Sequence, residues 1–236
     1  MACAAASWCF SSASRAAGKR RPFQGVTQTG LSDYHAGMAR DLNDKLTPRE
    51  RLLAAADELF YREGVRSVGI DRVIERAGVA KATLYNAFGS KEELVKAYLD
   101  SRHEARRRRL AQAMEGIDSP RGKLLVVFDV MDKLFAAPSY RGCAFLNASA
   151  ESPAGGLVEK VSDEYREWVR SMFEGLASDA GASDPRQLAQ QLVLLYDGAT
   201  VAAQMDRDRT AALAAKDVAT ALVDAAIRRG PKRRAR

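Results

Sequence analysis

The sequence predicts an all-α protein, and three observations support this prediction. From Thr47 onward, apolar residues recur at the three- and four-residue spacing of a helix. Helix start and stop signals divide this stretch into about nine segments. No stretch of useful length alternates apolar and polar residues as a half-buried strand does. We therefore expect an N-terminal three-helix unit that contains a helix-turn-helix, followed by a C-terminal helical part.

Composition and cysteine usage exclude several classes of protein. The chain has 236 residues, 47% of them apolar, which is enough to bury a core. Charged residues interrupt every long apolar segment, so we expect no membrane span and a soluble protein. Cys3, Cys9 and Cys143 form no CxxC pair and lie near no histidine cluster, so no disulfide framework, metal site or cofactor is indicated. A reducing cytoplasm is the simplest location.

Residues 1–46 differ in composition from the rest of the chain. The first thirty contain no acidic residue and many small or turn-forming ones, so we expect a disordered N-terminal extension. The composition is also compatible with an organellar transit peptide. Because the compact pattern begins just after Met38, that residue is an alternative translation start, and a genuine flexible arm is the other interpretation.

The net charge of +7 is unevenly distributed. Residues 228–236 carry six basic and no acidic side chains, and the predicted tail is 230–236. Residues 101–109 carry five basic and one acidic side chain, whereas 110–227 are acidic overall. Basic stretches beside an acidic body favour contact with a polyanion at one end of the molecule. The alternative interpretation is that Arg106 to Arg109 form a solvated helix face and the tail is frayed.

Three helices are predicted between residues 47 and 95. Thr47, Pro48 and Glu50 form a capping box with proline at the first helical position, so a helix starts at 48 and runs to about 62. Gly64 supplies its stop. A second helix spans 70–77, with Gly69 in the N-cap position, and a third spans 81–88 after the turn at Gly78.

The third of these helices has two distinct faces. Leu84 and Phe88 share the face that packs on the first two helices. The opposite face carries a cation, a small residue, a phenol and an amide, with a hydroxyl on its flank: Lys81, Ala82, Tyr85, Asn86 and, on the flank, Thr83. These groups suit phosphate oxygens and base edges, and a helix of two turns fits the major groove.

A phosphate-binding helix start follows this segment. Ser90 and Glu93 make a second capping box, and Lys91 lies in the first turn of the helix that begins there. Free amides at a helix N-terminus, together with a lysine, bind phosphate. We therefore expect Lys91 to hold the DNA backbone next to the helix that reads the bases.

The stretch from Arg51 through Leu94 resembles the DNA-binding domain of the TetR family of bacterial transcriptional regulators. The resemblance rests on AADELF, Gly64, AGVAKATLY and the F-x-S-K-E-x-L of Phe88 to Leu94. It implies that the positions which touch operator DNA are Lys81, Thr83, Tyr85, Asn86 and Lys91, with Ala82 in close approach.

Two positions depart from the family pattern. Gly69 stands where Thr or Ser usually caps the second helix, and Ala80 stands where Ser usually caps the third. Each change weakens a cap by up to about 1 kcal/mol and removes a hydroxyl that could contact phosphate. Without the resemblance, a three-helix domain that binds protein instead of DNA would be the competing interpretation.

Six more helices are predicted after residue 90, at about 91–114, 120–136, 140–150, 156–180, 185–205 and 210–229. The resemblance implies that residues 96–229 form an effector-binding and dimerisation domain. It also implies that the last two helices, about 185–205 and 210–229, pair with their symmetry mates in a homodimer. Both are rich in Ala, Leu and Val at helical spacing, which suits a four-helix bundle. The alternative is that they close the core of a monomer.

A mostly apolar ligand pocket is expected in this second part. Its candidate lining residues are aromatic or apolar with a few polar groups: Phe128, Met131, Phe135, Tyr140, Cys143, Phe145, Asn147, Tyr165, Trp168, Met172 and Tyr196. Each of them is also compatible with a plain core position. Cys143 is interpreted either as a thiol that senses electrophiles or oxidants or as an inert buried cysteine.

The predicted function is a DNA-binding transcriptional regulator. The resemblance implies a ligand-responsive repressor that binds a palindromic double-stranded DNA operator as a homodimer and is released by a small, mostly apolar effector. An enzyme is not expected, since the chain contains no GxSxG, Walker loop or HExxH, and both histidines, His35 and His103, lie outside the expected core. The alternatives are a constitutive DNA binder without an effector, a helical protein-interaction module, and a helical enzyme with no visible motif.

Overall fold

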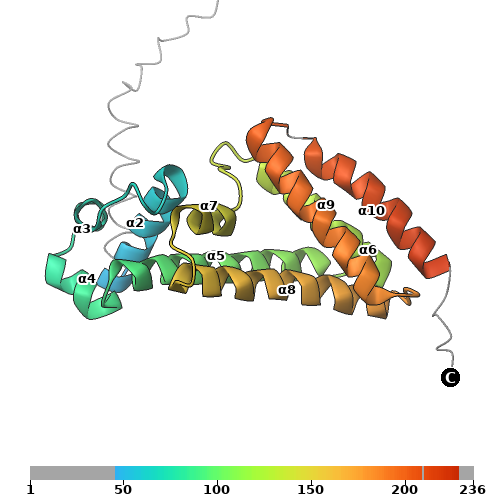
Figure 1. The fold of residues 1–236 in the computed structure, drawn as a ribbon, viewed down its shortest axis with the longest axis horizontal. Helices are drawn as coiled ribbons and strands as arrows, with labels where there is room; N and C mark the ends of the chain where they lie inside the picture. The colour runs from blue at the N-terminus through green and yellow to red at the C-terminus, as the bar shows by residue number, and fades with distance from the viewer. Residues whose placement is uncertain (1–45, 209, 229–236) are drawn as a thin grey trace, which may run out of the picture. The chain divides into compact units, whose positions relative to one another are not determined.

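The structure, a computed structural model, describes residues 46–208 and 210–228, which form helices connected by short loops and no strand (Figure 1). The all-α prediction is confirmed. No helix in the described part of the chain is long and apolar enough to cross a membrane. The predicted N-terminal extension with Met38, the tail at 230–236, and Cys3, Cys9 and His35 lie outside the described residues.

The described helices follow the predicted order. They are α2 (Pro48–Glu63), α3 (Ile70–Ala77), α4 (Lys81–Phe88), α5 (Lys91–Met114), α6 (Pro120–Phe135), α7 (Ala144–Glu151), α8 (Leu157–Asp179), α9 (Pro185–Met205) and α10 (Ala211–Arg228). In the second part, α8 packs on α5 and α9, and α10 packs on α6 and α9 (Figure 1).

Capping explains where α2 and α5 begin. The Thr47 hydroxyl accepts a hydrogen bond from the Glu50 amide at 3.3 Å, and the Glu50 carboxylate accepts one from the Thr47 amide at 2.7 Å, so the predicted box is complete. Ser90 supplies one half of the second box, because its hydroxyl accepts from the Glu93 amide at 3.1 Å. Both helices therefore start where the sequence indicates.

The predicted start of α7 is wrong by about four residues. The prediction began this helix near Tyr140, whereas it begins at Ala144. Gly142 has φ +87°, a left-handed conformation that breaks a helix and that residues with side chains rarely adopt. The Tyr61 hydroxyl holds the same loop, since it accepts from the Arg141 amide at 2.9 Å and donates to the Gly142 carbonyl at 3.0 Å.

Helices α2, α3 and α4 share one apolar cluster. Leu52 and Leu84 are fully buried in it, and Val73 and Phe88 join them from α3 and α4. Gly78 ends α3 in the left-handed region at φ +63°, and its amide donates to the carbonyls of the last turn. Val79 then packs against the core.

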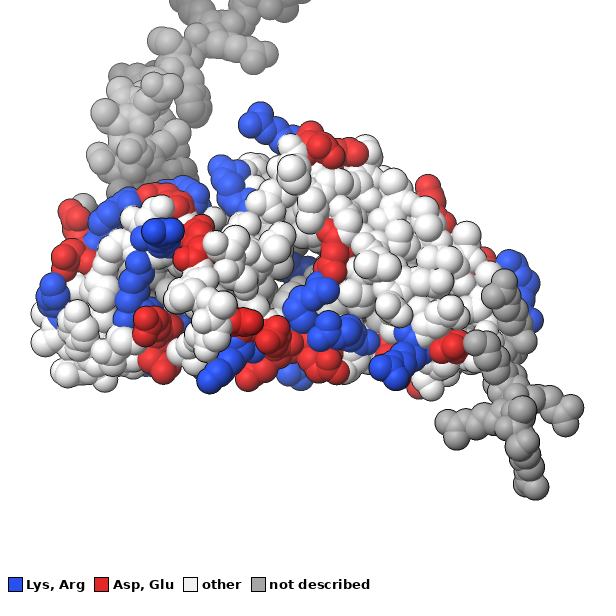
Figure 2. Space-filling model, viewed as in Figure 1, with Lys and Arg blue, Asp and Glu red and all other residues white. Residues whose placement is uncertain are grey.

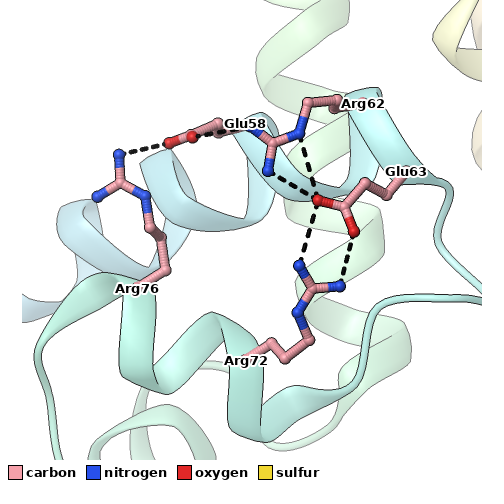
Figure 3. Close-up of polar contacts among 5 residues, drawn as sticks. All are labelled: Glu58, Arg62, Glu63, Arg72 and Arg76. Atoms are coloured by element: carbon pink, nitrogen blue, oxygen red, sulfur yellow. Dashed lines mark hydrogen bonds and ion pairs between the residues drawn. The ribbon is translucent and has the colours of Figure 1, made fainter.

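A network of ion pairs also joins α2 to α3 (Figure 3). The Arg72 guanidinium donates to the Glu63 carboxylate at 2.6 and 3.2 Å, and Arg62 donates to it at 2.7 Å. Arg76 pairs with Glu58 at 2.7 Å. The pKa of the Glu63 carboxyl is lowered to about 2, because Arg72 and then Arg62 donate hydrogen bonds to its charged form.

Besides apolar packing of Phe60 on Tyr98, three contacts of polar groups connect α2 and the loop after it to the rest of the described chain. The Arg102 guanidinium of α5 binds the Asp57 carboxylate of α2 through two nitrogens and lies 3.8 Å from the centre of the Tyr61 ring. The Tyr61 hydroxyl holds the loop before α7, as described above. The Glu151 carboxylate at the end of α7 accepts from the Arg66 amide at 2.8 Å.

We expect Glu63→Gln to destabilise the protein at neutral pH, because the ion pairs with Arg72 and Arg62 are lost. The folded pKa of Glu63 lies below its ordinary value of 4.5, so its contribution to stability is fully present above about pH 4.5. That contribution disappears as pH falls through about 2. Urea unfolding of wild type and variant between pH 7 and pH 2 measures the difference. Glu174→Gln, at an exposed carboxylate on α8, is the control, and an equal loss in both variants would contradict this role.

Candidate nucleic-acid interface and ligand cavity

Helix α4 presents the predicted DNA-contacting side chains on its outer face. Leu84 is fully buried and Phe88 nearly so, which anchors the inner face. Of the predicted contact residues on this helix, Lys81, Ala82, Tyr85 and Asn86 are exposed, and Thr83 is half-buried. Tyr85 is 45% exposed, although large aromatic side chains are usually covered. The arrangement leaves a short helix with a polar, sterically open face.

Lys81 forms an ion pair with the neighbouring helix. Its ammonium lies 3.0 Å from the carboxylate of Asp71 at the start of α3, and the two side chains are 61% and 84% exposed. The hydrogen bond to Asp71 raises the pKa of Lys81. Since an exposed pair of this kind contributes little to stability, a phosphate oxygen can take the place of Asp71 at small cost.

Lys91 lies at the first position of α5, where it borders a shallow cavity lined by Val65, Arg66 and Glu151. Burial lowers its pKa, and the nearby Glu151 carboxylate opposes this effect. The structure therefore places Lys91 in the first turn of its helix, as predicted, but directs it partly toward the end of α7. The charges that line this cavity balance, because Arg66 and Lys91 face Glu92 and Glu151.

The two unusual cap positions have no side-chain cap. Neither Gly69 before α3 nor Ala80 before α4 makes a side-chain hydrogen bond to the helix that follows. Arg49 was not among the predicted site residues, but its guanidinium lies 4.7 Å from the centre of the Phe88 ring, beside the end of α4. Helical spacing could not have predicted this contact, because it joins segments far apart in the chain.

A cavity of about 600 Å³ lies in the second part of the protein, among α5, α7, α8 and α9. It corresponds to the hollow near the middle of the face drawn in Figure 2, where α7, α8 and α9 approach one another in Figure 1. Its volume is in the range that holds a drug-sized ligand. A second cavity of about 410 Å³ extends from it toward α2 and is lined by Asp57 and Tyr61.

The structure brings some of the predicted pocket residues together at the larger cavity and places others elsewhere. Those that line it are Phe135, Tyr140, Cys143, Phe145, Tyr165 and Tyr196. Phe128 and Met131 are buried in the helical core, and Trp168 and Met172 pack at its edge. Asn147 faces away, since it donates to the Arg141 carbonyl at 2.9 Å and accepts from Gln204 at 3.1 Å.

Aromatic rings form much of the cavity wall. The Phe145 and Tyr165 rings stack with centres 3.9 Å apart and planes 2° apart. The hydroxyls of Tyr165 and Tyr196 lie 2.9 Å apart and share a hydrogen bond. Burial raises the pKa of Tyr165 well above its ordinary value of 10, so this phenol stays protonated at neutral pH.

Arg106 is a cavity residue that the sequence analysis missed. Its guanidinium lines both cavities and donates a 2.5 Å hydrogen bond to the Tyr196 hydroxyl. The interpretation of Arg106 to Arg109 as a solvated face is wrong for this residue and holds for the exposed Arg107, Arg108 and Arg109. Helical spacing could have revealed this, because Leu99 and Leu110 are buried on the same face of α5, seven residues before and four after.

His103 packs against the edge of the core. Its ring centre lies 4.8 Å from that of Trp168 and 5.4 Å from that of Tyr165, and its Nε2 is buried without a hydrogen-bond partner among the described residues. Burial, and then the charge of Arg107, lower the pKa of His103. His103 is half-buried, so it lies at the edge of the core and not within it.

Comparison with known proteins identifies the family. A family model described as "Bacterial regulatory proteins, tetR family" matches residues 52–98. A TetR-family transcriptional regulator from Streptomyces coelicolor has a similar structure, with a TM-score of 0.67 and 32% sequence identity, over 78% of this chain and 96% of its own. The chain belongs to the TetR family.

The matches to sequence relatives in the TetR family extend beyond the helix-turn-helix. The transcriptional activator FasR from Mycolicibacterium smegmatis is 30% identical over 151 residues, which cover 62% of this chain and 68% of FasR. The transcriptional repressor NemR from Escherichia coli is 26% identical over 171 residues, covering 67% of this chain and 85% of NemR. One relative is thus named an activator and another a repressor.

Membership of the TetR family makes the chain a DNA-binding transcriptional regulator and not an enzyme. Within residues 46–208 and 210–228, no three His, Cys, Asp or Glu side chains are grouped so that they could hold a metal ion. The sequence resemblance to this family is confirmed, and the helix-turn-helix of α3 and α4 lies within the matched residues.

We expect the stability of this TetR-family protein to fall as pH is lowered from 7.5 to 5.5, partly because of His103. Its folded pKa lies below its unfolded value of about 6.5, so the unfolded chain takes up a proton that the folded protein resists. His103→Phe should remove this part of the pH dependence in urea unfolding. His35→Gln measures the contribution of the other histidine, and an unchanged slope in His103→Phe would disprove the assignment.

Proposed function

We propose that this TetR-family regulator is a repressor that binds a palindromic operator as a homodimer and is released by a small effector. The observation that carries the proposal is the outer face of α4, where Tyr85 and Asn86 are exposed beside Lys81 while Leu84 anchors the helix. In this proposal residues 47–95 form the DNA-binding domain and 96–229 the effector-binding and dimerisation domain. Its location is the cytoplasm, where bacterial operators lie.

In this proposal α4 contacts the DNA bases, and the residues around its outer face contact the DNA phosphates. The Asn86 amide and the Tyr85 hydroxyl are of the kind that hydrogen-bonds base edges, and Ala82 permits close approach to the groove. Lys81 exchanges Asp71 for a phosphate, and Lys91 holds a second phosphate with the free amides of α5. Thr83, on the flank of α4, adds a hydroxyl for a backbone contact.

An uncovered apolar surface on α9 and α10 supports the homodimer. Leu194, Val201 and Met205 of α9 are 67%, 37% and 75% exposed and recur at spacings of seven and four residues, so they share one face. Leu213 and Val218 of α10 are 46% and 49% exposed. Figure 2 shows few charged side chains over these two helices. Burial of this surface against a second copy would form a four-helix bundle.

A two-fold dimer explains how an effector could act. Its two α4 helices enter successive major grooves only when they lie about 34 to 36 Å apart. Helix α5 contributes Arg106 to the cavity wall and Lys91 beside α4, so a ligand that shifts α5 changes the separation of the two reading helices. The effector must bind one arrangement more tightly than the other, because equal affinities would shift nothing.

Two alternatives remain to be separated by experiment. A constitutive DNA binder would bind the operator with an affinity that no small molecule changes. A helical protein-interaction module would bind no specific DNA. Because FasR is named an activator and NemR a repressor, the repressor assignment also needs a transcription measurement with the operator in front of a reporter.

We expect the purified protein to bind a specific site in the DNA that flanks its own gene, in excess competitor DNA. Tyr85→Ala should weaken specific binding by about tenfold or more, since a lost base contact costs about 1 to 3 kcal/mol. Lys91→Ala should weaken binding to all sequences and reduce the salt slope of the dimer by about 2, one for each subunit. Lys160→Ala, at an exposed lysine of α8, is the matched control. No specific shift at low salt would reject operator binding.

We expect Leu194→Asp combined with Met205→Asp to convert the dimer to a monomer. The two carboxylates would be buried without partners in the interface, which should raise the dissociation constant of the dimer by about 100-fold or more. Sedimentation velocity measures the mass of each species. Leu46→Asp, at an exposed leucine before α2, is the control. A double variant that sediments like wild type would place the interface elsewhere.

A further inference from the structure

The cavity contains a cation that the described protein does not neutralise. Arg106 reaches the cavity from α5 and makes one hydrogen bond, from Nη1 to the Tyr196 hydroxyl. None of the ion pairs among residues 46–208 and 210–228 includes it. A guanidinium carries five N–H donors and stays charged in proteins, so most of its donors remain to be satisfied.

The groups beside Arg106 are hydroxyls and a thiol, and none of them is a carboxylate. They are the hydroxyls of Tyr196, Tyr165 and Tyr140 and the thiol of Cys143. Burial raises the pKa of Tyr165 and of Tyr140 above the ordinary value of 10. Both phenols therefore stay protonated at neutral pH and cannot supply a negative charge. Arg106 is half-buried, and a partly desolvated cation without a counter-ion is stabilised when an anion binds to it.

The carboxylates of the cavity are at its rim or already paired. Asp197 accepts from Nη1 of Arg166 at 2.6 Å through both oxygens. Glu159 accepts from the Gly155 amide, and both Glu159 and Asp163 are exposed to solvent, which screens their charge. Positive charge thus lies at the inner wall and negative charge at the rim. An anionic group fits the inner position, and the acidic rim disfavours a ligand with anions at both ends.

The remainder of the wall is apolar. The stacked Phe145 and Tyr165 rings form one side, and Leu134 and Val201 lie on the wall as well. Flat apolar surfaces of this kind favour an aromatic or hydrocarbon body. The 600 Å³ volume leaves room for that body beside the guanidinium.

We propose that the effector of this regulator is an amphipathic organic anion, whose single acidic group binds Arg106 and Tyr196 while its apolar body lies against Phe145 and Tyr165. This inference rests on the proposed function, in which the cavity is the effector site. The guanidinium would donate two parallel hydrogen bonds to a carboxylate or a sulfonate, and the Tyr196 hydroxyl would orient it. Arg106 then becomes the residue that selects anions over neutral molecules of the same shape.

Two fluorescent probes of the same skeleton test the inference. Anilinonaphthalene sulfonate is an aromatic anion, and N-phenylnaphthylamine is its uncharged parent. We expect wild type to bind the sulfonate at least about tenfold more tightly than the parent, as a charge-assisted hydrogen bond implies. Arg106→Gln should lower the affinity for the sulfonate by about tenfold and leave that for the parent within about twofold. Arg106→Lys should restore part of the preference, and the charge-matched control Arg107→Gln should leave both affinities unchanged.

Equal affinities of wild type for the two probes, or an equal loss of both in Arg106→Gln, would overturn the inference. Circular dichroism of each variant separates a local effect from misfolding, and Arg106→Lys keeps the test decisive if Arg106→Gln does not fold. DNA binding is measured on the same preparations. Specific operator binding without a sulfonate preference rejects the anionic effector alone. A sulfonate preference lost in Arg106→Gln, without operator binding, rejects the proposed function and retains the anion site.

Discussion

The Arg102 guanidinium links the helix-turn-helix unit to α5, beside the packing of Phe60 of α2 on Tyr98 of α5. From α5 it binds both oxygens of Asp57 on α2 and covers the Tyr61 ring. Planar, bidentate pairs of this kind fix orientation as well as distance. Because Leu84 and Phe88 of α4 pack into the same cluster as α2, the contact of Arg102 with α2 also bears on the placement of α4. Helices α2, α3 and α4 without α5 would lack this contact with Arg102.

The loop before α7 connects this junction to the cavity. Tyr140, Gly142 and Cys143 line the cavity, and the Tyr61 hydroxyl grips the backbone of the same loop from α2. Occupation of the cavity and placement of α2 therefore involve one short segment of chain. The Glu151 carboxylate at the other end of α7 makes a second connection, to the backbone at Arg66. Both contacts use backbone groups, so they depend on loop geometry more than on side-chain identity.

Much of the fold could be predicted from the sequence because its signals are local. Capping residues such as Thr47 and Ser90 mark helix starts within one or two positions, and the spacing of Leu84 and Phe88 assigns the inner face of α4. The predicted start of α7 was wrong because Gly142 adopts a left-handed conformation, in a loop whose backbone is held by Tyr61, 80 residues before Arg141. The residues that line the pocket were harder to predict, because the same apolar residues occur on helix faces that pack in the core and on faces that line a cavity.

Residue type alone also does not separate positions in the core, at the cavity and on the surface. Phe128 and Met131 look like pocket residues yet pack in the core, whereas Arg106 looks like a surface residue yet lines the cavity.

The charge balance around α4 has a consequence for how the regulator finds its site. Residues 47–95 contain eight basic and eight acidic side chains, and Arg72, Arg76 and Lys81 are paired with carboxylates. Such a surface has little long-range attraction for arbitrary DNA. For a regulator that binds an operator through α4, we therefore expect short-lived contacts with other sequences, and a search by dissociation and rebinding more than by sliding along the duplex.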